Sequence, residues 1–149
     1  MATLLYQQSN VEIFWEDRDQ WLQVNWTGLQ SPVEVQRDCE QLLRLLAAKN
    51  ANSVLNDTSR VDGIWIGSAD WGADWFHRMR QSGLKYFAAV SSENRTSHGT
   101  TGTPLDAAAA GTAKAFFSVE EAANWLRTQR RRDSARTQRI VLPPNLGRS

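Results

Sequence analysis

Three short segments that contain apolar residues open the chain, at Thr3–Tyr6, Val11–Trp15 and Trp21–Trp26. The second and third alternate between apolar and polar positions, which is typical of a strand with one buried face. The connectors between the segments, SN and EDRDQ, are polar and favour turns. We therefore predict three strands arranged as an antiparallel meander.

A helix is predicted directly after this meander. The run Ser31-Pro32-Val33-Glu34 has the form of a capping box, with serine as N-cap, proline at the first helical position and glutamate at the third. The apolar residues that follow recur at the spacing of one helical face: Val35, Cys39, Leu42, Leu43 and Leu46. Asn50 or Asn52 is expected to close the helix, because asparagine tolerates the left-handed conformation.

The second part of the chain alternates between strand and helix patterns. Strands are predicted at Ser53–Asp57, Leu84–Val90 and Ala113–Phe117. Helices are predicted at about Ser68–Ser82 and from Val119 onward, and one or two helical turns at Leu105–Ala110. The continuous apolar run of Leu84–Val90 is typical of a central strand covered on both faces. Such alternation predicts crossover connections over a largely parallel sheet.

Composition limits the class of protein. A chain of 149 residues with 41% hydrophobic residues fits one globular domain that needs no disulfide or metal to fold. The single cysteine, Cys39, excludes an internal disulfide. The first residues lack the pattern of a secretory signal, and no apolar run has the length of a membrane helix. We therefore expect a cytoplasmic protein without a membrane span.

Charge divides the chain into two unequal parts. Residues 130–149 hold six arginines and one acid, a charge of +5, so the other residues carry −4 of the total of +1. We expect an α/β domain at 1–129 and a basic tail at 130–149 that is either disordered or docked on the body. In the docked case, Ile140–Leu142 would add a strand to a sheet edge. A tail that binds nucleic acid is disfavoured, because no aromatic residues lie between its arginines.

Four groups of residues are candidates for a catalytic, metal or phosphate-binding site, and each also has an ordinary structural explanation. Asp70, Asp74 and His77 share a helical face and could hold a metal, but a solvated face is favoured. The Gly- and Thr-rich run 98–103 lacks the spacing of a phosphate-binding loop. Cys39 lies on an apolar stripe and is expected to be a buried thiol. No nucleophile-elbow pattern supports a triad of Ser68, Asp57 and His77. No catalytic, metal or cofactor site is therefore predicted.

Seven tryptophans are the most unusual feature of the composition. Trp71 and Trp75 are expected to face the core together with Met79, and Trp15, Trp26 and Trp125 are expected to pack inside. The run Ile64-Trp65-Ile66 is harder to bury, and it follows a strand at the place where open α/β sheets bind ligands. We predict that an interaction surface there comprises Ile64, Trp65, Ile66, Ser68 and Asp70.

Several stretches together resemble a known family. The opening LLYQQSNVEIFWEDRDQWLQVNWTG, the SPVE cap, the SVLNDTS strand and the FFSVEEAANWL ending resemble small bacterial STAS-like domains over about residues 3–129. These domains are similar in fold to anti-sigma-factor antagonists and distantly to the CRAL-TRIO fold. The resemblance implies a mixed α/β sheet of about five to six strands with helices packed against it. It also implies protein–protein regulation as the main use.

The family's best-known members are phosphorylated on a serine in an Asp-Ser-Ser-Gly-like turn. The corresponding stretch here, residues 61–70, lacks that motif, and Ser68 is its nearest hydroxyl. We therefore expect a non-catalytic interaction or regulatory module without cofactors, with a protein or a second copy of the chain as partner. The alternative is a carrier that binds a lipid or another small apolar ligand between sheet and helices.

Overall fold

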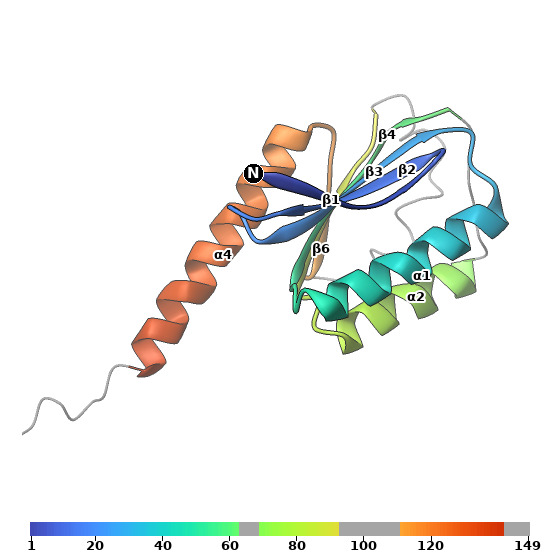
Figure 1. Ribbon diagram of the computed structural model, residues 1–149. Helices are drawn as coiled ribbons and strands as arrows, with labels where there is room; N and C mark the ends of the chain where they lie inside the picture. The colour runs from blue at the N-terminus through green and yellow to red at the C-terminus, as the bar shows by residue number, and fades with distance from the viewer. Residues whose placement is uncertain (63–68, 93–110, 142–149) are drawn as a thin grey trace, which may run out of the picture.

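The computed structural model describes residues 1–62, 69–92 and 111–141. For residues 69, 70 and 137–141 it describes the backbone but not the side chains. The described residues form six strands and three helices (Figure 1): β1 Ala2–Gln8, β2 Val11–Glu16, β3 Trp21–Gly28, α1 Pro32–Ala48, β4 Ser53–Val61, α2 Ala69–Gln81, β5 Tyr86–Val90, β6 Ala113–Phe116 and α4 Val119–Val141. The predicted helical turns at Leu105–Ala110 lie outside the described residues.

All six strands belong to one sheet, in the order β1-β2-β3-β4-β5-β6. The pairs β1–β2 and β2–β3 are antiparallel, whereas β3–β4, β4–β5 and β5–β6 are parallel. The predicted meander, the largely parallel second part and the mixed α/β class are therefore confirmed.

Local chemistry explains where α1 begins and ends. The Ser31 hydroxyl accepts a hydrogen bond from the backbone N–H of Glu34 (3.3 Å), as an N-cap does, and Pro32 occupies the first helical position. At the other end Lys49 is the C-cap, and Asn50 adopts a φ of 53°. Both the predicted cap and the predicted closing asparagine are thus confirmed.

Helices α1 and α2 lie side by side on one face of the sheet (Figure 1). The apolar stripe of α1 is buried as predicted, and so are Trp75 and Met79 of α2, while Trp71 is partly buried and stacks on Trp75. These side chains meet the inward-facing residues of β2 and β3, including Trp15 and Trp26. One apolar layer therefore joins both helices to all six strands, with β1 and β6 contributing only partly buried residues.

Helix α4 packs on the opposite face. Ser118 caps its start by accepting a hydrogen bond from the N–H of Glu121 (3.1 Å). Ala122, Ala123 and Leu126 are buried against Leu55, Ala88 and Val90 of β4 and β5. Trp125 is partly buried and contacts the rings of Tyr86 and Phe116. Strand β5 is thus covered on both faces, as its apolar sequence predicts.

Two expectations need correction. The strand predicted at Ser53–Asp57 continues to Val61, because Arg60 and Val61 still pair with Thr27 and Gly28 of β3. The prediction that Ile140–Leu142 could add a strand is wrong, because Ile140 and Val141 belong to the last turn of α4. Residues 130–141 therefore continue the helix that begins at Val119. Within the described ranges, no helix combines the length and apolar character needed to cross a bilayer.

The apolar stripe of α1 generates the first prediction. Replacing Leu42 or Leu43 with alanine should lower the free energy of unfolding by about 2–5 kcal/mol, because both side chains are buried and the layer cannot collapse around the gap. Thermal and urea denaturation measure the loss, with Arg44→Ala on the exposed side of the same helix as control. Variants that melted within a degree or two of the wild type would contradict this packing.

Candidate functional site

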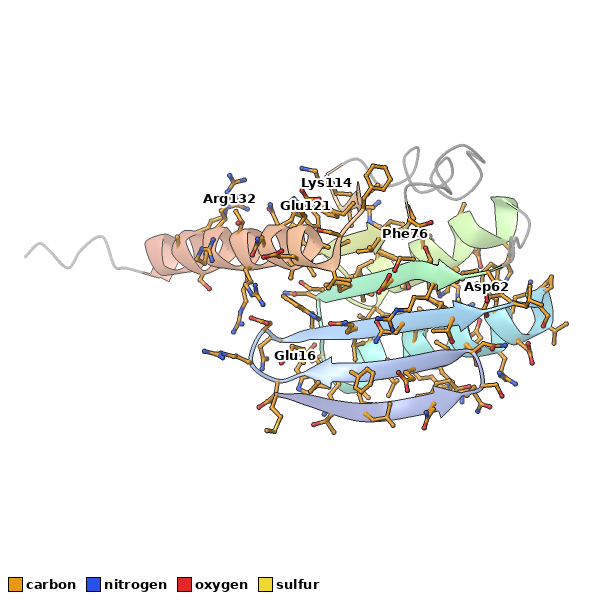
Figure 2. All side chains as sticks on the ribbon, turned by 90° about the horizontal axis from the view of Figure 1, so that it is seen from above. Glu16, Asp62, Phe76, Lys114, Glu121 and Arg132 are labelled. Carbon is orange, nitrogen blue, oxygen red and sulfur yellow. The ribbon has the colours of Figure 1, made fainter. Side chains whose placement is uncertain are left out.

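The carboxyl ends of the parallel strands meet at one edge of the sheet, where open α/β sheets commonly bind their ligands. Strands β3 and β4 end there at Gly28 and Val61, and α1 and α2 begin at the same edge (Figure 1). The backbone N–H of Asp62 donates to the carbonyl of Gly28 (2.8 Å) and ties the two strand ends together. Figure 2 labels Asp62 at this edge.

The predicted interaction surface maps onto the link between β4 and α2 at this edge. Ile64, Trp65, Ile66 and Ser68 lie outside the described residues, as does the side chain of Asp70, whose backbone forms part of the first turn of α2. The surface therefore stays a prediction from sequence.

On the described part of this edge, two exposed apolar side chains lie next to the end of β3. Leu29, between β3 and α1, is 71% exposed, and Val33, in the first turn of α1, is 78% exposed. We call Leu29 and Val33, together with Asp62, the rim. Sequence reasoning missed both apolar residues, because Leu29 reads as part of a turn and Val33 as part of a capping box. The sequence signal that would have indicated this surface is the pair of apolar residues on either side of the N-cap of α1.

The backbone beneath Leu29 is held firmly. The Asn10 side chain donates from Nδ2 to the Leu29 carbonyl (3.0 Å), and the Gln30 amide donates to the carbonyls of Asn10 (3.0 Å) and Thr27 (2.7 Å). Gly28 completes this clamp with a φ of +69°, a conformation that favours glycine. The exposure of Leu29 thus belongs to a fixed backbone rather than to a loose turn.

Just inside the same edge, β4 carries a run of polar residues that the sequence reading did not single out. Asn56, Asp57 and Thr58 are buried. The Asn56 carbonyl oxygen accepts from the Trp26 indole (2.8 Å), and the Thr58 hydroxyl donates to the Val90 carbonyl (2.9 Å). Asp57 accepts from both the backbone N–H (2.9 Å) and the hydroxyl (2.6 Å) of Ser59. Each of these three side chains therefore has a hydrogen-bond partner, as buried polar groups in a stable core do.

The other candidate groups do not come together as a reactive site. Asp74 and His77 are exposed on α2, on the opposite side of the sheet from Asp57, and Ser68 lies outside the described residues. Among the residues that the structure describes, no three metal-binding side chains are grouped. Cys39 is fully buried, and burial raises the pKa of its thiol well above the usual value. The run 98–103 lies outside the described residues.

Comparison with known proteins gives a limited result. No protein-family model matches the sequence, and no curated protein matches it. The chain is similar to the solved structure of an uncharacterized DUF3478-family protein with a SpoIIAA-like fold from Shewanella loihica, with 18% identity over 85% of this chain and 92% of that one, at a TM-score of 0.43. A SpoIIAA-like fold is of the STAS-like kind that the sequence resembles. The likeness adds nothing about activity or partners.

The clamp under Leu29 generates a prediction about the rim. Gly28→Ala should destabilise the protein by about 1–2 kcal/mol, because alanine is strained at positive φ. Its Cβ would also lie 3.2 Å from the Asn10 side-chain oxygen, so the clamp would have to shift. Gly72→Ala is the control, since a Cβ there meets nothing within 4 Å and α2 should gain stability. Equal melting temperatures for the two variants would contradict the account.

Proposed function

We propose that this chain is a non-catalytic interaction module that binds a protein partner through the rim. The observation that carries the proposal is the exposure of Leu29 and Val33 on a backbone that is clamped in place. Exposed apolar side chains held rigidly lose little conformational entropy on binding, so they are efficient anchors for a partner.

The neighbouring sequence supports the same proposal. The link that leaves the rim at Asp62 carries Ile64-Trp65-Ile66, which would extend the apolar character of the rim. Aromatic residues are enriched at the centres of protein interfaces, and tryptophan is among the strongest contributors to binding. The proposed contact surface therefore includes Ile64, Trp65, Ile66, Ser68 and Asp70 in addition to the rim.

Two further observations favour a module over the alternatives. The space between the sheet and the helices α1 and α2 is filled by large side chains, including Trp26, Phe76 and Phe87, which are at most 1% exposed. This packing gives no support to a carrier of apolar ligands. Asp57 of β4 is buried and accepts two hydrogen bonds from Ser59, which gives no support to an acid–base or nucleophilic role for it.

The rim generates a matched pair of variants. Leu29→Asp should change the melting temperature by no more than about 2 °C, since exposed substitutions are usually nearly neutral, yet it should weaken partner binding roughly tenfold or more. Ala47→Asp, at the exposed far end of α1, adds the same charge away from the rim and should leave binding unchanged. Binding is measured by quantitative pulldown with the tagged full chain. Equal recovery of the partner by both variants would rule out the rim as its contact surface.

Trp65 generates a second pair. Trp65→Ala should leave the melting temperature nearly unchanged and weaken partner binding, because the side chain is proposed to make partner contacts. Trp75→Ala serves as the core reference, since Trp75 is buried and its indole donates to the Cys39 carbonyl (3.2 Å). If Trp65→Ala lost as much stability as Trp75→Ala, Trp65 would belong to the core instead.

A further inference from the structure

The two faces of the sheet are covered unequally. Helices α1 and α2 lie against one face, while α4 packs mainly on β4, β5 and β6 of the other face. In Figure 2 no helix lies in front of β1–β3 on the α4 side. Apart from Trp21 at the start of β3, no helix among the described residues packs against this half of the face. We call it the open half.

The open half combines apolar and acidic side chains. Leu4, which is 45% exposed, pairs across the strands with the half-buried Phe14. Glu12 and Glu16 lie on the same face of β2 as Phe14, two residues to either side. The sequences of β1, β2 and β3 contain no lysine or arginine. The surface is therefore apolar at its centre with one acid on either side, and of these two acids Glu16 forms an ion pair with the amino group of Met1 (3.1 Å).

The basic segment of α4 has the opposite character. Arg130, Arg131, Arg132 and Arg136 are exposed, and the helix runs past the end of the sheet (Figure 1). We call residues 130–141 the arm. Its acid, Asp133, already accepts a hydrogen bond from Tyr86 (3.0 Å) and pairs with Lys85. In the described part of the chain, neither Arg132 nor Arg136 forms an ion pair.

The arm cannot neutralise the open half of its own molecule. It belongs to a continuous helix that is anchored by buried Leu126 and by paired hydrogen bonds from Arg127 to Asp19 (both 3.1 Å). Folding back would require that helix to break. Residues 134–141 continue for about 12 Å beyond Asp133 at 1.5 Å per residue, which is enough to reach a neighbouring molecule.

We propose that the open half of one copy receives the arm of a second copy, in a reciprocal two-fold dimer. Three strands spaced about 4.8 Å apart offer a surface about 10 Å wide, which matches the diameter of one helix. Each arm brings arginines to Glu12 and Glu16 of the other copy, and the same contact occurs twice, as two-fold symmetry requires. This surface is separate from the rim, so it leaves the rim free for a partner.

A second copy of the chain would account for both the arm and the open half, whereas nucleic acid would account only for the arm. Phosphates would account for the arginines of the arm but not for the open half, and the acids of the open half would repel a polyanion bound beside it. A membrane surface would require an apolar stripe along the arm. From Arg127 to Arg139 the helix is instead polar or charged except at Ala135, and its apolar residues Ile140 and Val141 are confined to the last turn.

Charge reversal tests the dimer. Arg132→Glu/Arg136→Glu reverses the arm, and Glu12→Lys/Glu16→Lys reverses the open half. Each variant should be monomeric at protein concentrations where the wild type dimerises at low salt, because each contact becomes repulsive, and dissociation constants should rise roughly tenfold or more. Mixing the two variants should restore a dimer, since every arm then meets an oppositely charged surface. Arg44→Glu/Arg80→Glu matches the charge change of the arm variant at exposed positions of α1 and α2, on the other face of the sheet.

Sedimentation equilibrium at low and high salt reads out the result, with circular dichroism to show that each variant is folded. A wild-type dimer that salt weakens, with loss in both variants and recovery in the mixture, supports the proposal. A wild type that stays monomeric at low salt would overturn it, as would a dimer that neither variant weakens. Salt-sensitive binding of a labelled DNA duplex by monomeric protein, lost in the arm variant, would assign the arm to nucleic acid instead.

Discussion

The apolar layer between the sheet and the helices α1 and α2 is the feature on which the rest of the structure depends. Its largest members need polar partners, because an indole N–H buried without one is costly. Trp26 donates to Asn56 of β4, and Trp75 donates to the Cys39 carbonyl of α1. Tyr6 donates to the buried Asp38 (2.7 Å) and so joins β1 to α1. These hydrogen bonds give the layer one packing arrangement rather than several.

Because this layer is filled by large side chains, the proposed contacts lie on the surface of the molecule. At the carboxyl edge of the parallel strands, the clamp around Gly28 keeps Leu29 in solvent. On the α4 side, three small or aliphatic residues let the helix approach β4 and β5 closely, while β1–β3 remain uncovered. This second surface arises because the described residues place two helices on one face of the sheet and only one on the other.

Local patterns were sufficient to predict much of this fold. The cap and stripe of α1, the meander and the doubly covered β5 all depend on residues close together in sequence. The last four residues of β4 were missed because the run that begins at Thr58 looks like a loop. Their place in the strand depends on distant residues, since Thr58 donates to the Val90 carbonyl and Val61 pairs with Gly28 of β3. The helical arm was missed for a similar reason, since Asp133 is held by Tyr86 and Lys85. At the candidate site, the sequence pointed to the edge where β4 ends but not to Leu29 or Val33.

Photocrosslinking from defined positions in living cells tests the central claim, that the rim is where this module meets its partner. A photoreactive phenylalanine analogue would replace Leu29 in one variant and Ala47 in another, both on exposed positions at opposite ends of α1. The account predicts one dominant protein adduct from position 29 and none from position 47. Adducts of the same mass and yield from both positions, or none from position 29 while the partner still copurifies, would contradict it.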